Sequence, residues 1–186
     1  MLAMGKARGY LRKTGDYRGD FYEFQAQLMG ETLKVPADRV MERVERLIYR
    51  GWEPLFNRIR LYPHVRETLD SFKKEGVRMG ILSDFPPDKK LENLHIHDYW
   101  EAVVCSEKVG RLKPDPASFL ELARKMDTDP GQILYVGNSV SYDVKGARLA
   151  GMKTALVRPG WKKRLPPLSA DFIFFDYRQL RDYVLS

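Results

Sequence analysis

The chain has 186 residues, of which 44% are hydrophobic, and its 32 basic and 25 acidic side chains give a net charge of +7. This composition excludes a disordered chain, and no apolar run approaches the roughly 18 to 20 residues that a membrane span needs. The single cysteine, Cys105, excludes an intrachain disulfide framework and a cysteine zinc site, so a cytoplasmic setting is the simplest expectation.

Two groups of basic residues account for much of the positive charge. They are Lys6, Arg8, Arg12, Lys13 and Arg18 near the N-terminus, and Arg158, Lys162, Lys163 and Arg164 further along. Neither group belongs to a zinc finger, an RNA-recognition motif or a helix-turn-helix pattern. We therefore expect no nucleic-acid partner and interpret both groups as solvated surface with a mild attraction for anionic substrates.

The first sixty residues read as helical throughout. Apolar side chains recur at helical spacing over residues 20–33, and Val40, Val44 and Ile48 form one stripe over residues 37–49. Pro36 precedes the second helix and Gly51 ends it, as is typical of helix termini. No strand-like run occurs before residue 60, so we expect a helical region over residues 1–60.

From Pro63 onward, short apolar strands alternate with helical segments. We expect strands over 77–84, 102–107, 133–138, 153–157 and 171–175, and helices over 64–76, 91–100, 116–126, 141–151 and 177–185. This alternation is typical of βαβ units and predicts an α/β fold with a doubly wound, mainly parallel sheet. The chain thus divides near residues 61–63 into a small helical region, residues 1–60, and an α/β region, residues 61–186.

Polar loops follow three of these strands, and in parallel sheets such loops share the edge where ligands bind. The first loop carries Ser83 and Asp84, whose hydroxyl and backbone N–H groups can donate to phosphate oxygens. In the second loop, Lys113 precedes Pro114. The proline restricts Lys113 to an extended backbone conformation and so limits the direction of its positively charged side chain. Taken singly, Ser83 and Asp84 are more often a helix N-cap or turn residues, and Lys113 is more often a surface lysine.

The third loop holds Asn138 and Asp143, five residues apart across a turn from strand to helix. Both side chains offer hard oxygen ligands of the kind that Mg²⁺ accepts. The alternative for this loop is structural, with Asn138 as a turn former and Asp143 as a helix cap.

The three loops together, in this order, resemble the motifs of the haloacid dehalogenase superfamily. The stretch ILSD looks like the second motif of that family, RLKPDP like its third, and YVGNSVSYDVKGARLAGM like its fourth. The resemblance covers Leu61 to Leu185, and the helical region before it is similar to the C1-type cap of such enzymes. It implies a Rossmann-like hydrolase core, most simply a Mg²⁺-dependent phosphatase of a small phosphorylated metabolite.

In that family an aspartate attacks phosphorus and forms an aspartyl-phosphate. The resemblance implies that Ser83 and Asp84 bind the substrate, that Lys113 neutralises charge on the phosphoryl group, and that the third loop holds the metal through Asn138 and Asp143. Most family phosphatases have aspartate at the position of Asn138, and an uncharged amide should weaken Mg²⁺ binding. Asparagine also occurs there in the metal-independent dehalogenases of the superfamily, which remain an alternative.

The first motif of the family, a central strand ending in Asp-x-Asp that carries the nucleophile and the acid-base residue, does not occur before residue 60. Two buried strands would lack a neighbour without it, and unpaired buried backbone groups cost about 1 to 3 kcal/mol each. We therefore expect this chain alone to be inactive and the upstream DNA to encode such a strand roughly 20 to 40 residues before Met4.

Another alternative is a non-catalytic pseudoenzyme that acts as a binding module. It requires a sheet that closes without the first-motif strand, or one that another chain completes in a homo-oligomer.

Overall fold

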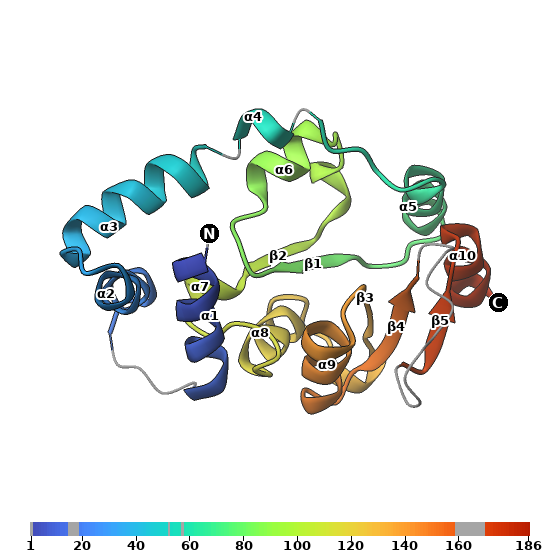
Figure 1. Cartoon of the computed structure of the whole chain (residues 1–186). Helices are drawn as coiled ribbons and strands as arrows, with labels where there is room; N and C mark the ends of the chain where they lie inside the picture. The colour runs from blue at the N-terminus through green and yellow to red at the C-terminus, as the bar shows by residue number, and fades with distance from the viewer. Residues whose placement is uncertain (1, 15–18, 52, 57, 159–169) are drawn as a thin grey trace.

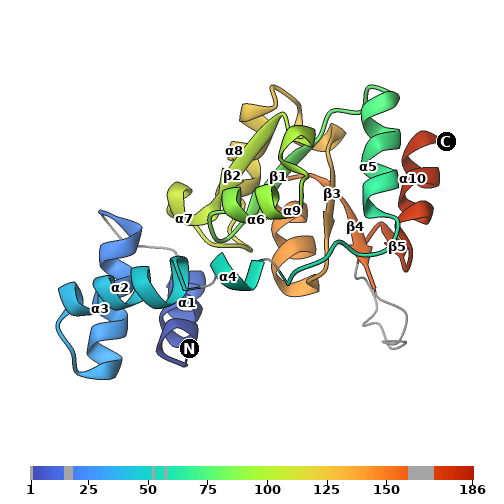
Figure 2. The same cartoon turned by 90° about the horizontal axis from the view of Figure 1, so that it is seen from above.

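The computed structural model describes residues 2–14, 19–51, 53–56, 58–158 and 170–186. The helices of its N-terminal region are α1 (Leu2–Thr14), α2 (Phe21–Leu33), α3 (Ala37–Val44), the π-helical turn η1 (Glu45–Tyr49) and α4 (Glu53–Phe56). Helices α1 to α3 lie together to one side of the strands (Figures 1 and 2). No strand precedes Gly80 among the described residues.

These N-terminal helices have a hydrophobic core of their own. Met4, Ala26, Val40 and Ile48 are among its buried members, and they come from α1, α2, α3 and η1 in turn. Helix α2 begins at a carboxylate cap, because Asp20 accepts hydrogen bonds from the backbone N–H groups of the first turn at 2.8 and 3.0 Å. The apolar stripes of the sequence thus face one another rather than the strands.

The five described strands are β1 (Gly80–Ser83), β2 (Ala102–Cys105), β3 (Leu134–Gly137), β4 (Lys153–Val157) and β5 (Phe172–Phe174). Every pairing between them is parallel: β1 with β2, β3 with β4, and β4 with β5. The carboxyl ends of paired strands are aligned, with Ser83 opposite Cys105 and Gly137 opposite Leu156. The α/β fold with parallel strands is therefore confirmed.

Helices cover both faces of the strands, as a doubly wound arrangement requires (Figure 2). They are α5 (Val65–Lys74), α6 (Asp88–Asn93), α7 (Ser106–Val109), α8 (Ala117–Lys125), α9 (Lys145–Leu149) and α10 (Tyr177–Leu185), with short turns η2 (His97–Tyr99), η3 (Pro130–Gln132) and η4 (Val140–Val144). Phe119 of α8 and Ala147 of α9 share a buried cluster with Leu82 of β1. Phe72 of α5 packs with Ala155 of β4 in a separate cluster.

The sheet consists of two sections in the described chain, β1–β2 and β3–β4–β5. Within the described residues, β1 therefore pairs on one side only, with β2, and β3 on one side only, with β4. Side chains join the two sections: Phe119 packs edge-on against Tyr135 of β3, with ring centroids 4.8 Å apart, in the cluster that holds Leu82. The described residues do not form the closed sheet that one form of the non-catalytic hypothesis requires, and completion of the sheet by another chain stays a prediction.

Several expected elements differ in detail from the structure, and the strand expected over 77–84 is limited to β1, Gly80–Ser83. The helix expected over 91–100 is α6 followed by η2, because His95 between them has the positive φ of 51° that interrupts a helix. The strand expected over 102–107 ends at Cys105, where the chain turns into α7. The helix expected over 141–151 begins as the π-helical turn η4. Among the described residues, no helix is both long enough and apolar enough to cross a membrane.

Candidate active site

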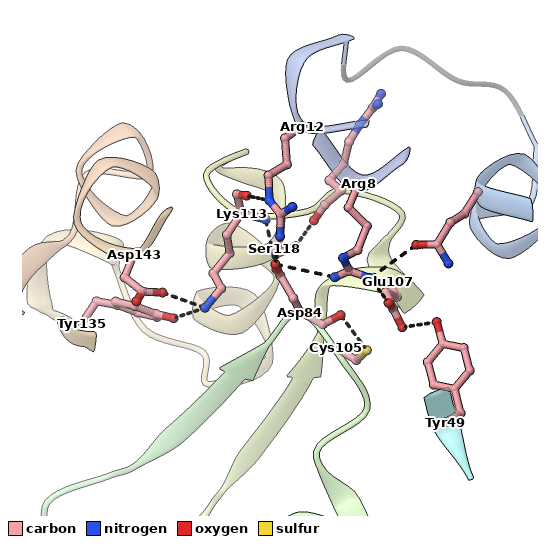
Figure 3. A network of polar contacts seen from close by, with 12 residues as sticks. Arg8, Arg12, Tyr49, Asp84, Cys105, Glu107, Lys113, Ser118, Tyr135 and Asp143 are labelled. Carbon is pink, nitrogen blue, oxygen red and sulfur yellow. Dashed lines mark hydrogen bonds and ion pairs between the residues drawn. The ribbon is translucent and has the colours of Figure 1, made fainter. Parts of the chain in front are cut away.

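Lys113 and Asp143 meet at the carboxyl ends of the strands. The Nζ atom of Lys113 lies 2.7 Å from Oδ1 of Asp143, and the two side chains are only 14% and 8% exposed. Ser83 ends β1 at the same edge, and Asn138 follows β3 directly. Figure 3 shows the lysine side chain reaching toward Asp143 and Tyr135. An ammonium group held this way can face a phosphoryl or carboxylate oxygen at the strand ends.

The loop between β3 and η4 is closely fitted around Asp143. Its Oδ2 atom accepts hydrogen bonds from the backbone N–H groups of Asn138 and Ser139, at 3.1 and 3.0 Å. Gly137 is required for this approach, because a Cβ atom there would lie 2.3 Å from Cβ of Asp143. The carboxylate is therefore fixed by two backbone donors and one lysine, and its orientation does not depend on solvent.

The surroundings of Lys113 keep it protonated. Burial alone would lower the pKa of Lys113, but the ion pair with the carboxylate of Asp143 opposes burial, and the pKa lies above the ordinary lysine value. Burial raises the pKa of Tyr135 to about 12, so its hydroxyl, 3.4 Å from Nζ, stays neutral. The site thus presents a permanent positive charge at neutral pH.

Asp84 and Arg12 hold the backbone of Lys113 from both sides. Oδ1 of Asp84 accepts the N–H of Lys113 at 3.2 Å, and Nε of Arg12 donates to the carbonyl oxygen of Lys113 at 2.9 Å. Arg12 and Asp84 are themselves joined at 2.7 Å, which closes a ring of three residues. The contacts of Asp84 in the structure are thus with protein donors, and its expected contact with substrate stays a prediction.

A second, deeper group of charges lies beside this ring. Glu107, whose side chain is fully buried, forms an ion pair with Arg8 and accepts a hydrogen bond from the hydroxyl of Tyr49 at 3.0 Å. The guanidinium of Arg8 also lies over the ring of Phe85, 4.0 Å from its centroid. Burial raises the pKa of Glu107, against the opposing effect of Arg8. The contacts join α1 and η1 to the α/β region (Figure 3).

The interpretation of the N-terminal basic residues as solvated surface is wrong for two of them. Arg8 is only 4% exposed and the Arg12 side chain only 18%, whereas Lys6 and Lys13 are exposed. Arg8 and Arg12 are four residues apart, and so lie on one face of α1. That spacing is the one signal in the sequence that could have singled them out. Arg18 and residues 162–164 lie outside the described residues.

Asn138 and Asp143 by themselves supply only a fraction of a magnesium site. Asn138 is exposed, and the oxygens of Asp143 already accept three N–H donors. Within the described chain, no three acidic, histidine or cysteine side chains come close enough together to hold a metal ion. Because Mg²⁺ takes about six oxygen ligands, the described residues do not complete its shell.

Replacing Arg12 with glutamine is expected to lower the free energy of unfolding by about 1 to 3 kcal/mol, because it leaves Asp84 without its closest partner and the carbonyl of Lys113 without a donor. Urea unfolding followed by circular dichroism measures this change. Lys13→Gln is the matched control, since it removes the same charge from an exposed position of the same helix. Equal effects of the two substitutions would contradict the positioning role of Arg12.

Several known proteins are similar to this chain in sequence. The family of haloacid dehalogenase-like hydrolases matches residues 19–157. The chain is 31% identical to the glyceraldehyde 3-phosphate phosphatase of Methanopyrus kandleri over 141 residues, which cover 74% of this chain and 60% of that protein. It is 29% identical to the phosphoglycolate phosphatase of Haemophilus influenzae, covering 81% of this chain and 69% of that one.

The fold also matches solved structures. The crystal structure of a 2-haloacid dehalogenase from Pseudomonas syringae pv. Tomato DC3000 superposes with a TM-score of 0.69 at 22% identity, covering all of this chain and 80% of that chain. This chain spans about 60% of the length of the Methanopyrus kandleri relative. Because the family match extends over most of the chain and includes the loops of Ser83, Lys113 and Asp143, the chain belongs to the haloacid dehalogenase-like hydrolases.

Proposed function

We propose that the active form of this protein is a phosphatase of a small phosphorylated metabolite. The observation that carries the proposal is the buried ion pair of Lys113 and Asp143 at the carboxyl ends of parallel strands, beside Ser83. A fixed positive charge at that edge suits a transferring phosphoryl group, on which negative charge spreads over several oxygens. The named activities of the two curated relatives support the same reaction class.

In this proposal each described residue has one task. The hydroxyl of Ser83 donates to an oxygen of the phosphoryl group, and Lys113 neutralises the charge that develops on it. Asp143 holds Lys113 at 2.7 Å and thereby aims it. The ring of Arg12 and Asp84 fixes the backbone of Lys113, so that the ammonium group needs little reorganisation when the substrate arrives.

The nucleophile is proposed to come from an additional strand that carries Asp-x-Asp and lies between β1 and β3. The support for this is the division of the described sheet, since both strands pair on their outer sides only. The first aspartate of such a strand would attack phosphorus and break the ester P–O bond, while the second would protonate the leaving alcohol, so that an aspartyl-phosphate forms. Water, activated by the second aspartate, would then hydrolyse the aspartyl-phosphate and release inorganic phosphate. The carboxylate of the first aspartate and the backbone carbonyl of the second would also supply oxygens for Mg²⁺, in addition to those of Asn138 and Asp143. Bound Mg²⁺ would screen the nucleophile from the phosphoryl charge.

The test compares two proteins: the 186-residue chain and the same chain extended by the residues encoded in frame upstream. We expect the extended chain to release phosphate from p-nitrophenyl phosphate with Mg²⁺ and to lose this activity in chelator, and the shorter chain to remain at background. An in-frame stop codon close upstream, or an upstream sequence without Asp-x-Asp, would contradict the proposed strand. Chelator-resistant release of halide from a 2-haloacid would instead identify the extended chain as a dehalogenase.

A further inference from the structure

A cleft of about 1060 Å³ lies between the N-terminal helices and the loop that follows β1. One wall comes from α2, α3, η1 and α4, and the other from residues 85–89. Phe85 and Pro86 begin the second wall immediately after Asp84, so the cleft opens beside the candidate active site. A phosphorylated substrate with its phosphoryl group near Lys113 would extend its remaining atoms in this direction. The chemistry of the cleft lining therefore selects the leaving group.

Aromatic rings make up much of the apolar lining of the cleft. They are Tyr22, Tyr49, Phe56 and Phe85. Three of them form a connected series, with Tyr22 and Tyr49 6.0 Å apart at 74° and Tyr49 and Phe85 6.4 Å apart at 61°. The hydrogen bond of the Tyr49 hydroxyl to Glu107 fixes the middle ring in place. Edge-to-face contacts of this kind hold Tyr22, Tyr49 and Phe85 in fixed positions relative to one another.

The charged side chains of the cleft are mainly acidic, although the chain as a whole has a net charge of +7. The acidic ones are Asp20, Glu23, Glu42, Glu45 and Asp88, against two basic ones, Arg50 and Lys89. Both basic groups have acidic partners: Arg50 lies 3.1 Å from Glu45, and Lys89 lies 3.1 Å from Glu92. The cleft therefore attracts cations. Its lining residue Phe85 directly follows Asp84, which contacts both Arg12 and Lys113.

We propose that this cleft binds the leaving group of the substrate and that this group is an alkylammonium alcohol of the choline or ethanolamine kind. A phosphomonoester of such an alcohol has its anionic end and its cationic end a few bonds apart, which matches the two neighbouring regions of opposite charge. Aromatic faces with nearby carboxylates recognise alkylammonium groups through cation–π and Coulomb attraction. The face of Phe85 already carries one cation, the guanidinium of Arg8. A leaving group with a carboxylate would instead meet five acidic side chains.

The proposal rests on the proposed phosphatase activity for the role of the cleft, but its ligand class can be tested without turnover. The binding of three compounds to the 186-residue chain can be measured by isothermal titration calorimetry: choline, its neutral isostere 3,3-dimethylbutan-1-ol, and glycolate. The first two have the same shape, so a difference between them reports the effect of the ligand's positive charge. We expect choline to bind about tenfold more tightly than the neutral alcohol, and glycolate not to bind. Equal affinity for choline and the neutral alcohol, preference for glycolate, or absence of binding by all three overturns the proposal.

Two substitutions locate the binding site. Glu42→Gln removes a carboxylate from the cleft and is expected to weaken choline binding about two- to fivefold, roughly the effect of one exposed charge. Glu31→Gln, at an exposed position of α2 outside the cleft, is the matched control and should leave choline binding unchanged. Equal effects of both substitutions would place the binding elsewhere and overturn the proposal. Choline binding by a protein whose extended form shows no phosphatase activity would reject the proposed function and leave the ligand class of the cleft intact.

Discussion

Replacing Arg8 with methionine is expected to lower the free energy of unfolding by about 3 to 5 kcal/mol, because it leaves the carboxylate of Glu107 buried without a counter-charge. The side chains of this pair are 5% and 0% exposed, so water cannot replace the lost partner. Tyr49 would still donate one hydrogen bond to Glu107, which does not balance a full charge. Urea unfolding at neutral pH, followed by circular dichroism, measures the change.

Two further variants separate the buried charge from a general effect of the substitution. Lys6→Met makes the same kind of change at an exposed position of α1 and should shift stability by no more than about 0.5 kcal/mol. The double variant Arg8→Met with Glu107→Met removes both charges and should recover most of the loss, since buried pairs can be replaced by apolar residues of similar volume. A double variant no more stable than Arg8→Met would contradict this explanation.

The Arg8→Met variant should also depend on pH in a defined direction. Burial already raises the pKa of Glu107 above its ordinary value of 4.5, and removal of Arg8 takes away the largest opposing effect. The folded variant therefore binds a proton at Glu107 more tightly than the unfolded chain does. Its stability deficit should be largest above the folded pKa and should shrink as the pH falls toward about 5. A deficit that grows on acidification would be inconsistent with a neutralised Glu107.

Replacing Lys113 with methionine is expected to reduce the phosphatase activity of the extended chain at least about 100-fold, mainly in kcat, because the substitution removes the charge that stabilises the transferring phosphoryl group. The same substitution leaves Asp143 without its ion pair, although its two backbone donors remain. We therefore expect the 186-residue chain to lose up to about 3 kcal/mol of stability. Phosphate release and urea unfolding measure the two effects separately.

Lys108→Met is the control for this prediction, because Lys108 is exposed on the short helix α7 and its replacement removes the same charge from the same protein. It should leave both activity and stability nearly unchanged. Lys113→Arg should not restore full activity, since a planar guanidinium cannot take the place of a compact ammonium in the contact with Asp143. Substantial activity in Lys113→Met would contradict the proposed role of this lysine.

The sequence predicted the arrangement of strands well because its apolar runs are short and bounded by clear turn residues. It also placed Lys113 and Asp143 in loops at one edge of the sheet, since loops that follow parallel strands share that edge, and the structure has these two side chains in contact. Their roles toward substrate and metal stay predictions. The position of these two residues thus follows from strand direction alone.

The contacts of α1 could not be read in the same way. Arg8 and Glu107 are 99 positions apart, and hydrophobic periodicity gives the face of a helix but not the residue it will meet. A basic residue on a short amphipathic helix is most often exposed, so the buried pair contradicts the ordinary expectation. The π-helical turns η1 and η4 carry Tyr49 and Asp143. The spacing of apolar residues in the sequence does not distinguish such turns from α-helix.

The contact of Phe119 with Tyr135 gives the described chain a particular pattern of local opening. No ladder of backbone hydrogen bonds crosses between β1 and β3 in the described residues, so the two sections of the sheet are coupled there by side-chain packing around Phe119. Side-chain packing couples the opening of the two sections less tightly than a shared ladder of backbone hydrogen bonds would. We therefore expect the β1–β2 section and the β3–β4–β5 section of the described chain to exchange their amide hydrogens with solvent at different rates.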